Sequence, residues 1–244
     1  MTEEISLTSF PEIIFQDADL LILYKPAGWF VHPPENRRFR RGLKRKTCVQ
    51  WLSDVHQIKA SPAHRIDVAT QGLVIFGLNK ISTAHLNQQF KNHTVNKTYL
   101  AAVRGWFKEK KTKITLDLEL DSTQELVPCE TQYEVLSEIE LPYQINSKFK
   151  TTRYSLLKVK PITGRWHQIR RHMNRVAHPI LGDREHGDSH HNRFFRDQLQ
   201  IAGLCLFAYQ IEFTHPTTLE LMSFKSLSNE NLKKISQLFL LEPF

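Results

Sequence analysis

The chain has 244 residues, of which 41% are hydrophobic and 24% charged, a mixture ordinary for a folded protein with one sizeable core. Lysines and arginines outnumber acidic residues, which gives a formal net charge of +8. A basic balance attracts polyanions, so nucleic acid or an anionic membrane is the first partner to expect. Charge that only aids solubility is the alternative.

Three cysteines, Cys48, Cys129 and Cys205, lie far apart in the sequence. An odd and sparse set forms neither a disulfide framework nor a zinc ribbon, so we expect reduced thiols and a cytoplasmic protein. The start, MTEEISLTSF, is acidic and lacks the apolar core of a signal peptide. No window reaches the roughly 18 apolar residues of a membrane span, so none is expected.

The predicted elements are mostly strands. In chain order they are strands at 19–25 and 72–78, a helix at 81–93, strands at 97–105, 113–120, 131–140 and 151–162, a helix at 164–178, strands at 204–213 and 219–224, and a helix at 229–241. Hairpin-like spacing predominates, which predicts an α+β fold with a mainly antiparallel mixed sheet flanked by helices and loops. Without internal repeats or long linkers, a single domain over 1–244 is expected.

The segment 33–46, PPENRRFRRGLKRK, carries seven lysines and arginines between 37 and 46. Runs of like charge are usually solvated and disordered. A phosphate-binding arm that becomes ordered on RNA fits the pattern equally well, because Phe39 and Leu43 interrupt the charges. Both interpretations stay open on the sequence alone.

The segment 182–197, GDREHGDSHHNRFFRD, is rich in turn-forming residues and is expected to be an exposed loop. A metal site is suggested by its side chains His186, His190, His191, Asp183 and Asp188. Histidines four residues apart share a metal only on a helix, however, so no metal is predicted here.

The stretch 61–80, SPAHRIDVATQGLVIFGLNK, places His64, Arg65 and Asp67 just before an apolar run. A structural ion pair or a turn explains such an aspartate in most proteins. A catalytic carboxylate is the alternative, because a nearby guanidinium favours the charged form of a half-buried carboxyl group.

The predicted helix at 164–178 has two faces. The apolar stripe consists of Trp166, Ile169, Met173 and Val176. The polar face contains His167, Arg170, Arg171 and Asn174. On spacing alone, the arginines of this face are solvated.

Four segments, in this order, resemble the signature motifs of the RluA family of pseudouridine synthases. They are LLILYKPAGWFVH (20–32), HRIDVATQGLVIFGLNK (64–80), NKTYLAAVRG (96–105) and PITGRWHQIRRHMNRVAHPILGDREHG (161–187). The resemblance covers about residues 12–225. Three positions depart from the family pattern: Ile66 replaces a leucine, Gln71 replaces a serine, and Val68 replaces a residue that is often charged. None of these changes removes Asp67.

Within the family, KTTRYSLL (150–157) and GDREHGDSHHNRFF (182–195) are most similar to the TruC type, which acts on uridine-65 of tRNA. The chain also starts almost directly at the catalytic domain, as this type does. An N-terminal S4-type RNA-binding domain, which other members carry, is therefore not expected.

The resemblance implies the pseudouridine synthase catalytic fold and an enzyme that flips a uridine out of the RNA stack. The base is detached at N1 and rejoined through C5, with no net oxidation, so no cofactor is implied. The expected partner is RNA, foremost tRNA in its acceptor and T-stem region. We expect no membrane partner, and we expect the protein to be a monomer. The same reaction on ribosomal RNA, or a non-catalytic RNA-binding protein that kept the fold, are the alternatives.

The resemblance assigns catalysis to Asp67, Tyr99 and Arg170. Asp67 acts either as a nucleophile or by abstracting a sugar proton, and the sequence does not choose between these routes. Arg170 is expected to pair with this carboxylate. Tyr99 is expected to stack on the flipped uracil and to take the C5 proton. The presence of all three argues against a non-catalytic protein.

Five further residues are assigned to substrate binding. Arg65 is expected to fill the space left by the flipped base or to anchor a phosphate, and His64 to hold the loop. The remaining three, expected to serve the loop or the RNA backbone, are Arg165, His167 and Gln168.

Overall fold

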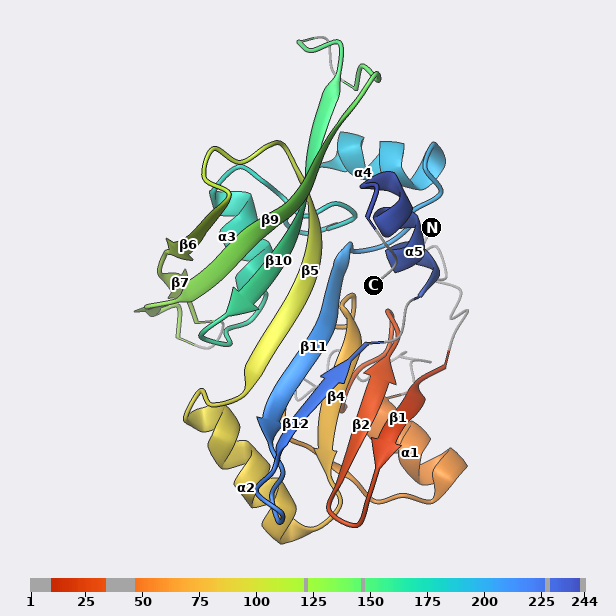
Figure 1. Cartoon of the computed structure of the whole chain (residues 1–244), viewed down its shortest axis with the longest axis vertical. Coiled ribbons are helices and arrows are strands. Elements are labelled where there is room, and N and C mark those ends of the chain that lie inside the picture. The colour runs from red at the N-terminus through yellow and green to blue at the C-terminus, as the bar shows by residue number, and fades with distance from the viewer. Residues whose placement is uncertain (1–9, 34–46, 121–122, 146–147, 227–228, 242–244) are drawn as a thin grey trace. The chain divides into compact units, whose positions relative to one another are not determined.

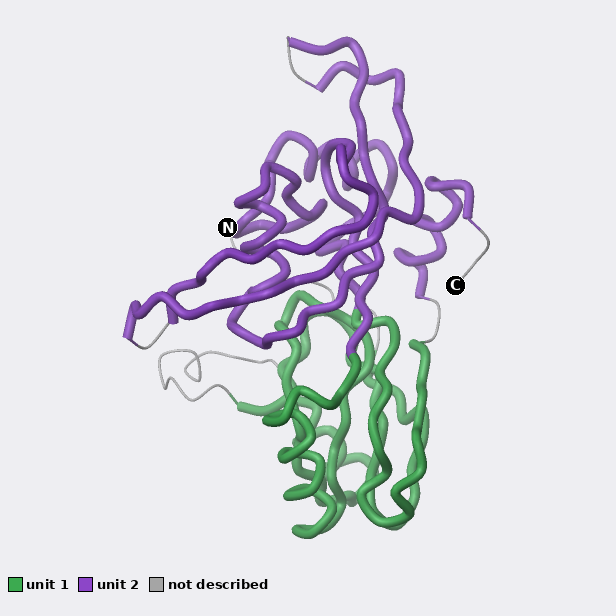
Figure 2. The backbone as a smooth tube through the Cα atoms, turned by 60° about the vertical axis from the view of Figure 1, so that its left-hand side comes forward, with its two compact units in different colours: residues 1–96, 208–227 green, residues 97–207, 228–244 purple. Residues whose placement is uncertain are grey.

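The computed structural model describes residues 10–33, 47–120, 123–145, 148–226 and 229–241 (Figure 1). The basic segment 37–46 lies outside these residues. Close contacts divide the chain into a first unit, 1–96 with 208–227, and a second unit, 97–207 with 228–244 (Figure 2). The expectation of one domain over 1–244 stays a prediction.

The first unit is built around a strand layer with the order β1-β2-β4-β11, where β12 pairs with β11 and β3 with β4. The strands are β1 (Glu12–Gln16), β2 (Leu20–Lys25), β3 (Ser61–Pro62), β4 (Gln71–Gly77), β11 (Leu206–Thr214) and β12 (Leu221–Lys225). The pairs β1–β2, β2–β4 and β11–β12 are antiparallel. The register sets Lys25 opposite Gly72, so the end of β2 lies beside the loop that leads into β4.

Two helices belong to this unit, α1 (Cys48–His56) and α2 (Lys80–Lys91). The side chain of Asn79 caps α2 by accepting a hydrogen bond from the Ser82 N–H at 2.8 Å. The core consists of Leu20, Ile22, Leu73, Ile75, Leu86, Val95, Ile211 and Phe213. Leu86 of α2 is completely buried, whereas Ile81 in its first turn is 81% exposed.

The second unit has a strand layer in the order β5-β10-β9-β6, with antiparallel pairing between neighbours. Its elements are β5 (Asn96–Arg104), β6 (Lys111–Thr115), β7 (Leu118–Glu119), β8 (Leu126–Val127), β9 (Glu130–Leu141), β10 (Thr152–Pro161), α3 (Gln168–Arg175), α4 (Ser189–Asp197) and α5 (Glu230–Leu238). Together with the first unit, this confirms the predicted α+β class and its mainly antiparallel pairing.

Several expected boundaries are wrong. The predicted strand 113–120 is divided into β6 and β7, and the predicted helix 164–178 is the shorter α3. The helix begins late because His167 adopts a left-handed conformation with φ 51°, and it ends before Ala177, whose φ is 64°. The strand β1 and the helix α1 were not predicted.

The segment 182–197 was expected to be a loop and instead contains α4. The Asp188 side chain caps this helix by accepting from the backbone N–H groups of His190 and His191. His191 Nδ1 is 2.9 Å from the Tyr154 hydroxyl, and the Phe195 ring packs against the Tyr154 ring. Burial against Tyr154 therefore stabilises a helix whose composition is that of a turn. Within the described ranges, no helix combines the length and apolar character needed to cross a membrane.

Candidate active site

The loop that carries Asp67 is held by a buried lysine at the end of β2. The side chain of Lys25 has no exposed surface, and its Nζ donates at 3.0, 2.9 and 3.2 Å to the carbonyl oxygens of Pro26, Trp29 and Val68. These bonds match the three N–H groups of an ammonium ion. Because Val68 directly follows Asp67, Lys25 joins the turn after β2 to the carboxylate loop.

Lys25 is also an electrostatic neighbour of the predicted catalytic group. Burial lowers the pKa of Lys25 to about 8, and the nearby Cys48 and Asp67 side chains oppose this shift. A positive charge at this place favours the ionised form of the Asp67 carboxyl group. No role was predicted for Lys25 from the sequence. A lysine at the end of the apolar run LLILYK (20–25) is unusual, and this feature could have indicated a buried charge.

The backbone around Asp67 has further constraints. The Gly28 N–H donates to the Val68 carbonyl at 2.8 Å, and the Thr70 N–H donates to the Asp67 carbonyl at 3.0 Å. Gly72 has φ 127°, and a Cβ there would lie 2.2 Å from the Ala208 carbonyl oxygen. Only glycine fits this conformation and this close approach, which explains the glycine of the motif.

His64 and Gln71 both contact neighbouring elements of the first unit. His64 Nε2 accepts from the Ile75 N–H at 3.1 Å, and its ring stacks on Phe90. Gln71, the departure from the family pattern, is buried and accepts from the Tyr24 hydroxyl at 3.1 Å. These contacts fit a loop-holding His64. Arg65 is exposed, and substrate binding by both residues stays a prediction.

Tyr99 lies half-buried on β5, opposite Val159 of β10. Lys97 is on the same face of the strand, two residues earlier, and burial lowers its pKa. A Cβ on Gly164 would be 3.8 Å from Lys97 Nζ. The face of β5 that carries Tyr99 is therefore next to the turn that leads into α3.

Arg170 is buried in the second unit rather than solvated. Its exposed fraction is 2%, so the solvated arginine that spacing alone indicates is wrong for Arg170; the neighbouring His167 is 8% exposed. Arg170 Nε and Nη2 donate to the two carboxylate oxygens of Asp183, each at 2.7 Å. Its Nη2 also donates to Glu185 at 3.1 Å, and its Nη1 lies 2.6 Å from His167 Nε2. The expected pairing of Arg170 with Asp67 joins different units and stays a prediction.

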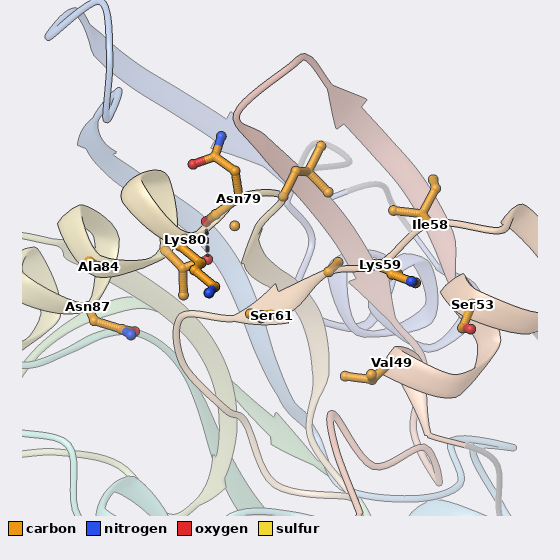
Figure 3. A pocket seen from close by; sticks show the side chains of 13 residues that line it. Val49, Ser53, Ile58, Lys59, Ser61, Asn79, Lys80, Ala84 and Asn87 are labelled. Carbon is orange, nitrogen blue, oxygen red and sulfur yellow. Dashed lines mark hydrogen bonds between the residues drawn. The ribbon is translucent and has the colours of Figure 1, made fainter.

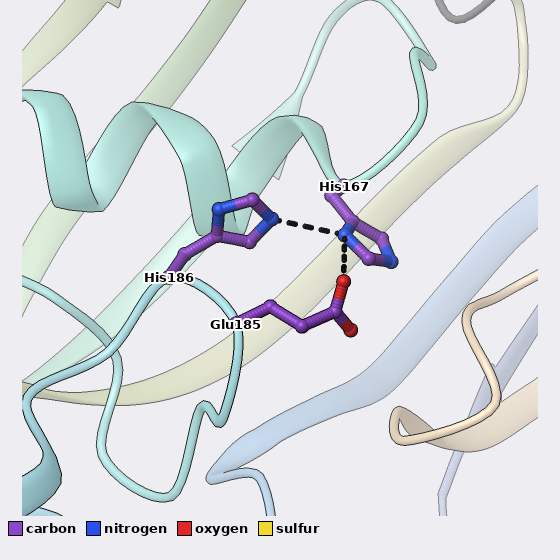
Figure 4. A group of neighbouring side chains, drawn as sticks. All are labelled: His167, Glu185 and His186. Carbon is purple, nitrogen blue, oxygen red and sulfur yellow. Dashed lines mark hydrogen bonds and ion pairs between the residues drawn. The ribbon is translucent and has the colours of Figure 1, made fainter.

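His167, Glu185 and His186 form the group of possible metal ligands that the described residues contain (Figure 4). His167 Nδ1 is 3.0 Å from His186 Nε2 and 3.7 Å from Glu185. Burial and the Arg170 charge lower the pKa of His167 to about 3, so this ring is neutral. Its Nε2 accepts from Arg170, which leaves the proton on Nδ1 for His186. A cation would need that nitrogen deprotonated beside a guanidinium, so this site does not favour a metal.

Gln168 and Arg165 lie at the start of α3. The Gln168 Oε1 accepts from the Thr163 hydroxyl at 2.7 Å and from the Arg165 N–H at 3.1 Å. Its Nε2 donates to the Glu130 carbonyl and the Thr131 hydroxyl, each at 3.0 Å. All four hydrogen-bonding positions of this amide are used within the protein, so Gln168 holds the turn. Arg165 is exposed.

A pocket of the first unit lies apart from these residues. Its volume is roughly 540 Å³, and it is lined by α1, the start of α2 and the segment between them, with Lys59, Lys80 and Asn87 among the side chains (Figure 3). None of the eight predicted site residues lines it. The candidate site therefore rests on the Asp67 loop and on the Arg170 cluster, each within its own unit.

A family model described as RNA pseudouridylate synthase matches residues 19–175. The match includes Lys25, Asp67, Tyr99 and Arg170. The chain belongs to the RNA pseudouridylate synthase family. The family prediction and the expectation of an enzyme that isomerises uridine in RNA are thereby confirmed.

Three curated relatives of this synthase are similar over most of their length. The tRNA pseudouridine synthase C of Vibrio parahaemolyticus is 36% identical, over 92% of this chain and 93% of the relative. That of Haemophilus ducreyi is 35% identical, over 93% and 95%. The protein from Vibrio vulnificus with the same name is 38% identical, over 85% and 86%.

Solved structures share the fold of this synthase. Human RNA Pseudouridylate Synthase Domain Containing 1 superposes with a TM-score of 0.66 at 21% identity, covering 96% of both chains. Human RNA Pseudouridylate Synthase Domain Containing 4 gives a TM-score of 0.68 at 20% identity, covering 94% and 93%. The predicted catalytic fold is confirmed, and the individual roles of the site residues stay predictions.

Proposed function

We propose that this synthase converts uridine-65 of tRNA, in the acceptor and T-stem region, to pseudouridine. The observation that carries the proposal is the 36% identity, over 92% of this chain, to a relative named tRNA pseudouridine synthase C. The segments 150–157 and 182–195, which resemble the TruC type, support the same target. Tyr154 of the first segment contacts His191 and Phe195 of the second, so the two form one packed feature.

The reaction is an isomerisation within one nucleotide. The bond between uracil N1 and C1′ breaks, the base turns, and C5 bonds to C1′, while a proton leaves C5 and N1 gains one. No group is lost and no electron acceptor is needed. Extruding the uridine costs a few kcal/mol, which binding of the flipped base must offset.

Asp67 is the residue that we assign to the bond-breaking step. Either its carboxylate attacks C1′, or it removes a proton from the sugar, and both routes need the ionised form. The buried ammonium of Lys25 supports this form, and the hydrogen bonds from Lys25 and Gly28 to Val68 fix the loop. The carboxylate is half-buried, as a group that must reach a substrate requires.

Tyr99 and Arg170 complete the proposed catalytic set. Tyr99 presents an aromatic ring on which a flipped uracil stacks, and its hydroxyl oxygen takes the C5 proton late in the reaction as its own proton passes to solvent. Arg170 supplies a positive charge that stabilises an anionic carboxylate or uracil. Arg65 is exposed, which fits a wedge or a phosphate anchor. His64, Arg165, His167 and Gln168 are proposed to support substrate binding through the two loops.

The partner is RNA, and the net charge of +8 supports its attraction to the enzyme. We place the reaction in the cytoplasm, in keeping with three buried cysteines that form no disulfide. The protein is proposed to act as a monomer.

Replacing the basic residues between 37 and 46 should flatten the salt dependence of tRNA binding if this segment contacts phosphates. An unchanged slope would remove it from the interface.

The target is tested by sequencing-based pseudouridine mapping of total RNA from cells with and without this gene. We expect one position of tRNA, uridine-65, to lose its modification. Purified protein should then restore that position in tRNA transcripts from the deleted cells. Loss of a ribosomal RNA position instead would move the same reaction to ribosomal RNA. Binding of the tRNA by the purified protein without formation of pseudouridine would mark a non-catalytic RNA-binding protein.

A further inference from the structure

Asp183 holds the guanidinium of Arg170 in one plane. The paired bonds from Nε and Nη2 reach its two oxygens at 2.7 Å each, and both side chains are almost completely buried. Parallel bonds of this kind set the orientation of an arginine as well as its position. Glu185 and His167 add bonds to Nη2 and Nη1, so the plane of Arg170 is set from three sides.

The Asp183 carboxylate is itself fixed by the backbone. Its Oδ1 accepts from the N–H groups of Glu185 and His186, each at 3.0 Å, in addition to the bond from Arg170. The Arg170 charge and these backbone bonds lower the pKa of Asp183 despite its burial, which raises it. The carboxylate is therefore ionised at neutral pH and cannot turn without breaking two backbone hydrogen bonds.

The loop of Asp183 is braced by α4. Asn192 Oδ1 accepts from the Gly182 N–H, and Asn192 Nδ2 donates to the Asp183 carbonyl oxygen, both at 2.7 Å. Gly182 has φ 75°, and a Cβ there would lie 1.7 Å from the Gly203 carbonyl oxygen, so the loop passes where only glycine fits. The chain of contacts runs from α4 through the loop to the guanidinium.

We propose that Asp183 is a positioning residue of the pseudouridine synthase reaction, which fixes the guanidinium plane of Arg170 for its catalytic task. The proposal rests on the catalytic role given to Arg170 under the proposed function. An arginine has several rotatable bonds, and a displacement of about 1 Å at a reacting group can lower a rate by on the order of 10²-fold. A purely structural ion pair would affect folding and leave the chemical step unchanged.

Asp17 in the first unit offers a matched control. Its Oδ1 accepts from the N–H groups of Asp19 and Leu20, each at 2.8 Å, and its Oδ2 is 2.9 Å from His215 Nε2. It is thus an aspartate that closes a turn and pairs with a basic side chain, as Asp183 does. It has no part in the proposed site.

The test is single-turnover pseudouridine formation at saturating tRNA, measured for Asp183→Asn, Asp17→Asn, Arg170→Lys and the double variant Asp183→Asn/Arg170→Lys. We expect Asp183→Asn to lower the rate constant by about 30- to 100-fold with the tRNA Kd within about twofold. Asp17→Asn should keep the wild-type rate. Because Asp183 acts through Arg170, the double variant should be no more than about threefold slower than Arg170→Lys.

The outcomes separate the two proposals. A wild-type rate for folded Arg170→Lys would overturn the catalytic role of Arg170. The positioning role of Asp183, which depends on it, would then be overturned as well. A slow Arg170→Lys with a wild-type rate for Asp183→Asn would overturn the positioning role alone.

A second measurement applies if Asp183→Asn fails to fold. In wild-type protein with ¹⁵N-labelled arginine, the Arg170 Nε–H, assigned by its loss in Arg170→Lys, should exchange with solvent at least about 100-fold more slowly than that of the exposed Arg193. Equal exchange rates would show that Asp183 does not hold the guanidinium and would overturn the proposal.

Discussion

Each unit buries a cation of the candidate site, and the two cations are stabilised in different ways. In the first unit, Lys25 is surrounded by three carbonyl oxygens, and burial lowers its pKa to about 8. In the second unit, Arg170 is paired with the carboxylate of Asp183. An ammonium group can release its proton when desolvation becomes costly, whereas a guanidinium cannot, so only the arginine requires a buried counter-ion. The comparison predicts that the units respond differently to mutation and to pH.

The largest expected effect is in the second unit. Asp183→Ala removes the carboxylate and leaves the Arg170 charge buried, which should lower the free energy of unfolding by about 3–5 kcal/mol. Urea unfolding of the wild type and the variant measures this difference. A loss no larger than that of an exposed control, Asp54→Ala on α1, would show that the Arg170 pair does not carry the stability of this unit.

Acid should weaken the second unit through its neutral histidines. The folded-state pKa of His167 is about 3, lowered first by burial, while an unfolded histidine has a pKa near 6.5. The unfolded state therefore takes up the proton first, so the contribution of His167 is present above pH 6.5 and is lost as the pH falls towards 3. Between pH 7 and pH 4 the loss should be about 3 kcal/mol.

Unfolding measured across this pH range for wild type and His167→Gln tests the assignment. The variant should show a shallower decline than the wild type. Parallel curves would mean that other groups cause the acid sensitivity, since burial also lowers the pKa of His172, His178, His186 and His191.

Alkali should stabilise the first unit through Lys25. Because the pKa of Lys25 is lowered from 10.5 to about 8, the unfolded state holds the proton more tightly, and the stability contribution of Lys25 rises with pH above 8. From pH 7.5 to pH 9.5 the wild type should gain about 2 kcal/mol relative to Lys25→Met. Thermal unfolding at both pH values measures the gain. A constant difference would place the Lys25 pKa near its ordinary value.

The smallest expected effect concerns the N-terminal cap of α2, which has no part in the proposed site. Asn79→Ala removes the cap of α2 and should cost about 1 kcal/mol of stability, with the single-turnover rate unchanged. Chemical denaturation measures the loss of stability, and the single-turnover assay with tRNA measures the rate. A slower single-turnover rate at saturating tRNA would show that the cap of α2 affects the chemical step, which would contradict its exclusion from the proposed site.

The strands of the core were predictable because their apolar runs leave few alternatives. Leu20–Lys25 and Gln71–Gly77 are buried along their whole length, and both were expected within one residue of their bounds. The helix α4 was missed because its sequence favours a turn, and the contacts that stabilise it come from Tyr154, which is 37 residues away from His191. Long-range packing of this kind is absent from local sequence patterns.

The candidate site was predictable in part. The resemblance pointed to Asp67 and Arg170, whose roles stay predictions, and helical periodicity alone gave the wrong environment for the arginine. Arg170 is buried because a carboxylate from the loop after α3 reaches it, and this loop was expected to be exposed. Lys25 was quoted only as part of a motif, because nothing in the spacing shows that three carbonyl groups converge on its ammonium.

The most direct test of the account is single-turnover pseudouridine formation in tRNA by Asp67→Asn, beside wild type and the exposed control Asp54→Asn. We predict that Asp67→Asn binds tRNA with a Kd close to that of wild type and forms no pseudouridine, while Asp54→Asn reacts at the wild-type rate. Pseudouridine formation by Asp67→Asn at a rate comparable to wild type would contradict the assignment of the carboxylate to catalysis.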